Sequence, residues 1–144
     1  MPGITVGVDG SDNSFRALEW AMKEAAVRKA DLTVLAVHEV AANQWTAHPM
    51  IMPEDEPMTQ QARSWSEEAV SKIAGQLGSE QPASVTVRAM SGFPAEELIK
   101  ASEDSDLVVV GSRGVGFAGL TVGSVTNKVV HHAECPVVVI RPSR

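Results

Sequence analysis

The sequence contains a single cysteine, Cys135, so no disulfide can form within the chain. Its flanks, His-His-Ala-Glu before and Pro-Val-Val-Val after, are typical of the start of a buried strand, and we expect a packed thiol rather than a reactive one. There is no apolar run of the ~18 residues that a membrane span needs, and no basic and then apolar leader follows Met1. These absences predict a cytoplasmic protein with no membrane contact.

Basic residues are few and scattered. The net charge is -6, and Lys and Arg do not form a stripe along one face, which opposes the phosphate-neutralising surface that nucleic-acid binding requires. With 144 residues, 44% of them hydrophobic, the chain can bury one sizeable core but is too short for two ordinary domains. We therefore expect one domain over residues 1–144 and no nucleic-acid partner.

Short apolar runs alternate with segments of helical period, which is typical of βαβ units and of a parallel sheet covered on both faces. Five strands are predicted, and they are Ile4 to Val8, Leu32 to Val37, Val85 to Ala89, Leu107 to Val110 and Val137 to Arg141. The fold class predicted is α/β.

Apolar spacings and cap residues predict four helices. The first follows the turn residues 9–14 and ends near Ala30, the third starts at Pro94, and the fourth starts at Gly123-Ser124. The second is the best defined because apolar residues recur three or four apart along it as a core stripe, ending at Gly78, and these are Met58, Ala62, Trp65, Ala69, Ile73 and Leu77. The three prolines and the acidic run of segment 41–57 predict a surface loop, with a lid or a partner contact as the alternative.

A glycine-rich loop joins the fourth strand to the fourth helix. Five glycines lie between Val110 and Ser124, and the helix after them begins with Gly-Ser. Glycines let backbone N–H groups approach an anion closely, and a helix N-terminus adds partial positive charge. Ser124 can donate a hydroxyl, and Arg113 can add a formal charge. The loop therefore predicts a phosphate site.

Three phosphate motifs compete for this loop. A Walker A loop needs a lysine before the serine, and Gly123 stands there instead. The spacing Gly114-x-Gly116-x-x-Gly119 matches the dinucleotide pattern, but the next strand ends in Arg141 where that pattern needs an acidic residue.

The third motif carries a family resemblance. Gly111-x-x-Gly114, eight residues and then Gly123-Ser124 closely resemble the nucleotide motif of the universal stress protein family. The resemblance covers essentially the whole chain, including Val-Gly-Val-Asp-Gly-Ser at 6–11, the Gly-x-Pro turn at 92–94 and Cys-Pro-Val-Val-Val-Ile-Arg at 135–141. It implies a Rossmann-like parallel sheet of order 3-2-1-4-5 with ATP or a related adenine nucleotide, with or without Mg²⁺, across the strand ends.

The resemblance also implies residue roles. Asp9 would meet the adenosine end of the ligand and Val37 would contact the adenine. The ribose and phosphates would be held by the glycine loop and the helix start, namely Gly111, Arg113, Gly114, Gly123, Ser124 and Val125. Strands 1 and 4 flank the point where the strand order reverses, which is where open α/β sheets bind ligands.

The loop is one residue shorter than the family motif, between Gly114 and Gly116. A shorter loop redirects N–H groups that would face the β- and γ-phosphates, so ADP, AMP and cyclic AMP are alternatives to ATP. Three of these residues also have a structural role as the alternative to ligand binding. Asp9 could cap the turn, Ser124 could be the helix N-cap, and Arg113 could be a solvated side chain. His131 and His132 fit the last turn of a helix better than a metal site.

No nucleophile with an adjacent base, metal cluster or paired carboxylates can be argued from the sequence, so catalysis is not indicated beyond slow ATP hydrolysis. The leading function is a nucleotide-responsive binding protein in a stress response. A nucleotide-free dimeric interaction protein is the alternative, and an adenylating enzyme ranks last because only Gly10 accompanies the aspartate and serine after strand 1. The apolar last strand, Val137 to Arg141, predicts a homodimer that pairs at the sheet edge.

Overall fold

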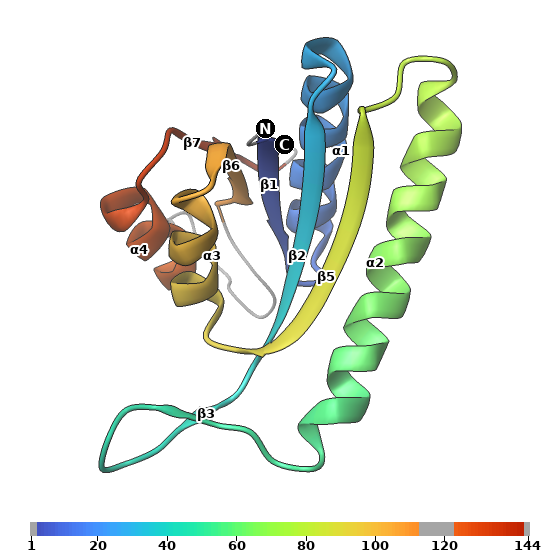
Figure 1. Ribbon diagram of the computed structural model, residues 1–144. Helices are drawn as coiled ribbons and strands as arrows, with labels where there is room; N and C mark the ends of the chain where they lie inside the picture. Colours follow the sequence, from blue (N-terminus) through green and yellow to red (C-terminus); the bar gives the residue numbers. More distant parts are fainter. Residues whose placement is uncertain (1–2, 113–122, 143–144) are drawn as a thin grey trace.

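The computed structural model describes residues 3–112 and 123–142. Five parallel strands form the main sheet in the order β5-β2-β1-β6-β7 (Figure 1). Their bounds are β1 Gly3–Val8, β2 Asp31–Glu39, β5 Ser84–Gly92, β6 Ser105–Gly111 and β7 Val137–Ile140. Counted along the chain, β5, β6 and β7 are the third, fourth and fifth strands of this sheet. The predicted order 3-2-1-4-5 is therefore confirmed, and so is the predicted α/β class. Each predicted strand end lies within three residues of the observed end.

The helices found in the described residues cover both faces of this sheet. They are α1 Asp12–Arg28, α2 Asp55–Leu77, α3 Pro94–Ser102 and α4 Ser124–His132. Helices α1 and α2 pack on one face and α3 and α4 on the other. The central strands β1, β2 and β6 are therefore covered on both faces, which explains why they read as nearly continuous apolar runs.

The core on the α1 side is the larger of the two. Leu18, Met22 and Ala25 lie three or four residues apart on α1 and are fully buried against β1 and β2, with Trp20 half-buried beside them. Ser11 caps α1 by accepting a hydrogen bond from the Ser14 backbone N–H, and Lys29 ends it in the left-handed conformation at φ 55°. The helix thus begins at Asp12, three residues earlier than the turn cluster 9–14 suggested.

Two predictions in the α2 region are wrong in detail. Segment 41–57 is not only a surface loop, because β3 Ala41–Ala42 and β4 Pro49–Met50 form a short antiparallel ladder and α2 already begins at Asp55. Met58, predicted as core, is 48% exposed because the first turn of α2 extends beyond the end of the sheet. Ala62 and Ile73 of the same stripe are buried as predicted.

Candidate functional site

A cavity of about 580 Å³ lies at the carboxyl ends of β1, β2 and β6. The start of α4 closes one side of it, and α2 forms a wall on another. Strand order reverses at this point, since β1 is followed along the chain by β2 on one side and is paired with β6 on the other. The volume falls in the range of about 300–1,000 Å³ that is usual for small-molecule sites.

Six of the eight site residues predicted from the sequence line this one cavity, although they come from four separate parts of the chain. They are Asp9, Val37, Gly111, Gly123, Ser124 and Val125. The other two, Arg113 and Gly114, lie outside the described residues, as does the part of the glycine loop that was predicted to be one residue shorter. The predicted site therefore has a common location for every member that the structure describes.

Asp9 lies in the turn between β1 and α1. Its Oδ1 accepts hydrogen bonds from the Ser11 backbone N–H at 2.9 Å and from the Ser11 hydroxyl at 2.6 Å. The capping role considered for Asp9 is thus present, and the residue is still exposed at the cavity. The turn passes through Gly10 at φ 87°, a conformation that favours glycine.

The start of α4, residues 123–126, lines the cavity. Gly123 is the N-cap and Ser124 is the first helical residue, so Ser124 itself is not the cap. The Gly123 N–H is used, since it donates to the Ser112 carbonyl at 2.7 Å, and the Thr126 hydroxyl donates to the Gly111 carbonyl at 2.6 Å. In an α-helix the N–H groups of the first turn have no acceptor within the helix, so this end attracts anions.

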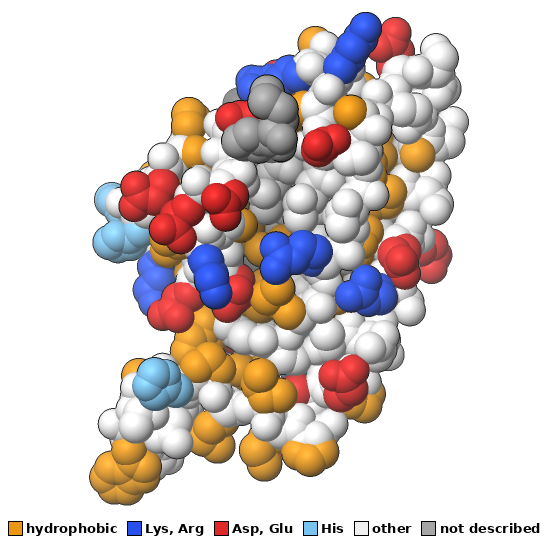
Figure 2. Space-filling view, viewed as in Figure 1, with side chains coloured by type: hydrophobic (Ala, Val, Ile, Leu, Met, Phe, Trp, Pro, Cys, Tyr) orange, Lys and Arg blue, Asp and Glu red, His pale blue; other side chains and the backbone are white. Residues whose placement is uncertain are grey.

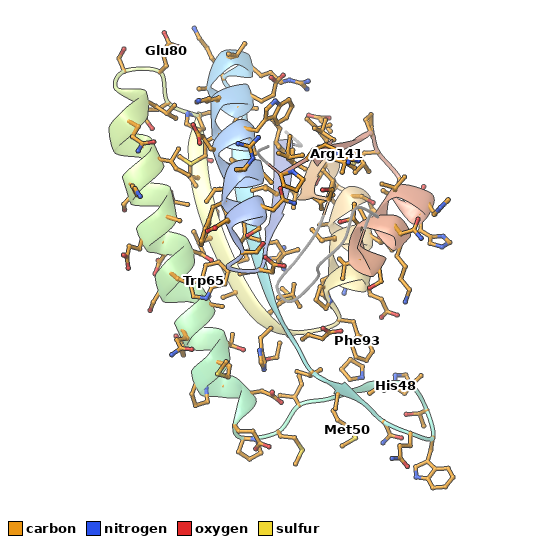
Figure 3. The ribbon with its side chains drawn as sticks, turned by 180° about the vertical axis from the view of Figure 1, so that it is seen from behind. His48, Met50, Trp65, Glu80, Phe93 and Arg141 are labelled. Atoms are coloured by element: carbon orange, nitrogen blue, oxygen red, sulfur yellow. The ribbon has the colours of Figure 1, made fainter. Side chains whose placement is uncertain are left out.

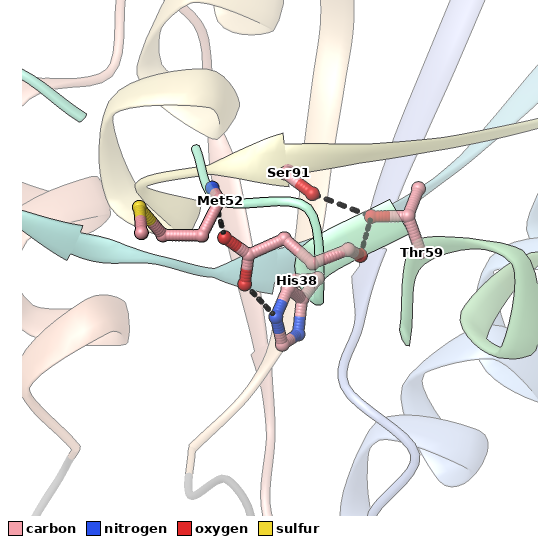
Figure 4. Close-up of polar contacts among 5 residues, drawn as sticks. His38, Met52, Thr59 and Ser91 are labelled. Carbon is pink, nitrogen blue, oxygen red and sulfur yellow. Dashed lines mark hydrogen bonds and ion pairs between the residues drawn. The ribbon is translucent and has the colours of Figure 1, made fainter. Parts of the chain in front are cut away.

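The end of β2 supplies the opposite wall. Val37 is half-buried there, and His38 and Glu39 continue along the cavity before the chain leaves the sheet. His38 Nε2 lies 2.8 Å from Asp55 Oδ1, and Asp55 Oδ2 accepts from the Met52 backbone N–H at 2.8 Å (Figure 4). These two hydrogen bonds hold the pKa of Asp55 below its ordinary value, and the bond from the Met52 N–H has the larger effect.

Helix α2 contributes side chains that the sequence reasoning did not assign to the site. Met58, Gln61, Ala62 and Trp65 line the cavity, and Figure 3 shows Trp65 projecting from α2 toward α1. The indole packs on the turn after β1, since a Cβ on Gly10 would lie 3.4 Å from its Cζ2. Phe15 meets the same ring edge to face, with centroids 5.7 Å apart.

Two of the cavity residues that the sequence reasoning did not assign to the site, His38 and Glu39 of β2, could have been predicted from their position. His38 and Glu39 directly follow Val37, and residues at the carboxyl end of a strand beside the switch point are site candidates by position. Trp65 had no such signal, because it belongs to an apolar helical stripe of the kind that usually packs into a core.

Ionisable side chains are few in the described lining of the cavity. Its described lining includes Asp9, His38 and Glu39 as ionisable side chains and no Lys or Arg. Within residues 3–112 and 123–142, no group of three or more His, Cys, Asp or Glu side chains is arranged to hold a metal ion. A cation there would have to be held largely by the phosphates of a ligand.

The other residues singled out from the sequence lie away from the cavity. His131 and His132 are exposed in the last turn of α4. Cys135 is half-buried, and burial raises the pKa of its thiol, as expected for a packed cysteine. No helix in the described ranges is long and apolar enough to span a membrane.

The relatives described here, from sequence and structure comparison, are all universal stress proteins. A universal stress protein of Mycolicibacterium smegmatis is 35% identical over 139 residues, which are 96% of this chain and 47% of the relative. The chain thus spans about half the length of such relatives. Among solved structures, a universal stress protein from Lactobacillus plantarum superposes with a TM-score of 0.71 at 26% identity, with 97% of each chain covered.

Two further solved structures contain nucleotides. A universal stress protein in complex with cAMP has a TM-score of 0.69 and 25% identity, covering 99% of this chain and 98% of its own. The universal stress protein of Archaeoglobus fulgidus in complex with dAMP has a TM-score of 0.61 and 28% identity, covering 97% and 98%. The model of the universal stress protein family itself matches residues 2–141. With nearly its whole length matched by that model, the chain belongs to the universal stress protein family.

Proposed function

We propose that this chain is a regulatory binding protein of a stress response, and that it holds an adenine nucleotide in the cavity at the carboxyl edge of the sheet. The observation that carries the proposal is the convergence of six predicted residues, from four separate parts of the chain, on one cavity beside a helix N-terminus.

Different parts of the cavity lining suit the base, the ribose and the phosphates of the nucleotide. The base lies between the end of β2 at Val37 and the α2 wall, where the surfaces are apolar or aromatic. The phosphates lie at the start of α4, where Ser124 and the first-turn N–H groups replace the missing cationic side chains of the described lining. Asp9 lies between these ends and accepts from the ribose hydroxyls.

Nucleotides bound to relatives support the adenine class without fixing the phosphate number. The cAMP and dAMP of the two related structures each carry a single phosphate. ATP, ADP, AMP and cAMP are therefore all candidates, and Mg²⁺ would enter with the di- and triphosphates. We expect no reaction faster than slow ATP hydrolysis.

The test is calorimetric titration of the wild type and Ser124→Glu with ATP, ADP, AMP, cAMP, adenosine and GTP. A carboxylate at the first helical position favours the helix dipole, so the variant should fold, but it repels phosphate. We expect a loss of about tenfold or more for phosphorylated ligands and little change for adenosine.

The matched control is Ser64→Glu, which adds the same charge at an exposed position of α2 away from the cavity. Binding of no adenine compound by the wild type would refute the proposal, and so would an equal loss in both variants. Mass spectrometry of small molecules released from freshly purified protein identifies the ligand independently.

A nucleotide-free dimeric interaction protein remains the second candidate, and the edge strand β7 favours it. Val108 N–H donates to the Pro136 carbonyl and Ser112 N–H donates to the Ile140 carbonyl. In a parallel ladder this alternation turns the backbone groups of Val137 and Val139 away from β6, toward the open edge. Pairing of two copies along β7 would satisfy them.

A further inference from the structure

Between β2 and α2 the chain leaves the sheet as a projecting hairpin, residues 40–53, which we call the arm (Figure 1). Its ladder has two residue pairs, Ala41 with Met50 and Ala42 with Pro49. A hairpin of this length is marginal on its own in water, so the arm needs support beyond its own ladder.

The tip of the arm is a defined turn that presents a tryptophan. Asn43 Oδ1 accepts from the Trp45 N–H at 2.8 Å and from the Thr46 N–H at 3.2 Å, and the Asn43 N–H donates to the His48 carbonyl at 2.7 Å. Such an Asx turn fixes the backbone locally. It leaves Trp45 90% exposed.

Both ends of the arm are anchored to the body of the protein. At the start, the Val40 N–H donates to the Gly92 carbonyl at 3.1 Å, at the end of β5. At the return, the Met52 N–H is held by Asp55, which also bonds His38 of β2. The exposed tip is therefore carried on a fixed base.

The arm concentrates apolar surface. Of the seven large hydrophobic side chains that are exposed in the described residues, four belong to these fourteen positions. They are Trp45 at 90%, Met50 at 38%, Ile51 at 63% and Met52 at 44% exposure. Clustered exposed apolar groups of this kind mark interaction surfaces, and Trp and Met are enriched in protein interfaces.

The arm is also free of formal charge on a strongly acidic chain. No Asp, Glu, Lys or Arg occurs from Val40 to Pro53, whereas the whole chain has a net charge of -6. In Figure 2 the projecting lobe at lower left carries hydrophobic side chains and a histidine. Two identical acidic molecules repel each other least where neither is charged, and an anionic lipid or nucleic acid finds no cation here.

We propose that the arm is a contact surface between two copies of this chain, in which the arm of each copy packs its Trp45 face against the other. A stable interface buries about 800 Å² on each partner, and Trp45 alone offers roughly 200 Å² of that. With Met50, Ile51 and Met52 it forms the apolar centre of an interface of standard size. This contact is separate from pairing at β7, which lies on the opposite edge of the sheet from β5.

The experiment is sedimentation equilibrium of the full chain from about 1 to 200 µM. The arm variant is Trp45→Ser with Ile51→Ser, and the matched control is Val27→Ser with Val130→Ser, whose parent side chains are exposed at 77% and 48% outside the arm. We expect the wild type and the control to associate alike, and the arm variant to associate at least about tenfold more weakly. Raising NaCl from about 20 to 200 mM should tighten wild-type association, because salt screens the repulsion between acidic copies.

Two results would overturn this assignment. One is a wild type that stays monomeric to 200 µM, and the other is an arm variant that associates as strongly as the wild type. If the wild type is monomeric, its co-sedimentation with phosphatidylcholine vesicles through the arm would make the partner a lipid surface. Circular dichroism of the arm variant verifies that the fold is intact, since neither substituted side chain is buried.

Discussion

Asp55 joins three segments of the chain through three different oxygen atoms. Its Oδ1 bonds His38 at the end of β2, its Oδ2 accepts from Met52 at the return of the arm, and its backbone carbonyl accepts from the Thr59 hydroxyl at 3.0 Å (Figure 4). Thr59 in turn bonds the Ser91 hydroxyl of β5 at 2.5 Å. One aspartate thus fixes the base of the arm beside the candidate nucleotide cavity.

Replacement of this carboxylate should produce a pH-dependent loss of stability. The pKa of Asp55 in the folded state lies below its ordinary value of 3.8, so its stabilisation is fully present above that pH and is lost as the pH falls through the lowered pKa. Asp55→Asn should therefore lower the free energy of unfolding at pH 7, with the difference from wild type narrowing below about pH 4. Urea unfolding at pH 7, 5 and 3.5 measures this, with exposed Glu54→Gln as the control. A difference that is the same at all three pH values would contradict it.

Some site residues could be predicted from the sequence and others could not, and the difference has a physical reason. Gly111 and Ser124 were predicted because glycine loops and helix starts have local signatures, and local signatures survive without knowledge of the tertiary structure, whereas the role of Asp9 was predicted from the family resemblance. The bond between His38 and Asp55 spans the whole arm, and the contact of Trp65 with Gly10 joins α2 to the turn after β1. Such contacts depend on how the elements pack.

Among the elements, α3 lies directly against β1 because a glycine leaves room for it. A Cβ on Gly7 would lie 2.9 Å from Leu98 Cδ1 and 3.0 Å from Cδ2, and Leu98 is buried between the two elements. Gly7→Ala should lower the free energy of unfolding by about 1–3 kcal/mol through overpacking. Differential scanning calorimetry checks this, and an unchanged melting temperature would show that α3 can shift without cost.

Gly75 in α2 is the contrasting case. A Cβ there meets nothing within 4 Å, and the residue is exposed in the last turn of α2, which ends at Leu77. Gly75→Ala should raise the free energy of unfolding by about 0.5–1 kcal/mol, because alanine loses less backbone entropy on folding than glycine does. The same calorimetry serves both variants, and destabilisation by Gly75→Ala would mean that the exposed face of α2 is covered in solution.

The elements of the main sheet could be predicted because each is long enough for a periodic pattern. β3 and β4 could not, since two residues per strand give no alternation, and their pairing depends on the Asx turn between them. The error at Met58 has a related cause: periodicity identifies the apolar face of α2 but not where the sheet beneath it ends.

At the scale of the whole molecule, the sheet has an open edge at β7. Val139→Pro removes an N–H that faces away from β6 and leaves the ladder to β6 in place. If copies pair along this edge, light scattering should give the variant a lower mean mass than both the wild type and Val139→Thr, which keeps the N–H. Equal masses for all three proteins would exclude β7 as a contact, whatever the arm does.

The three tryptophans of the chain occupy three regions with different tasks. Trp20 packs against the core, Trp45 is at the tip of the arm, and Trp65 lines the cavity. Each indole therefore emits from a different environment, and a Phe replacement of one removes a single signal. Unfolding, association and ligand binding can accordingly be followed separately by fluorescence in the same protein without attaching a dye.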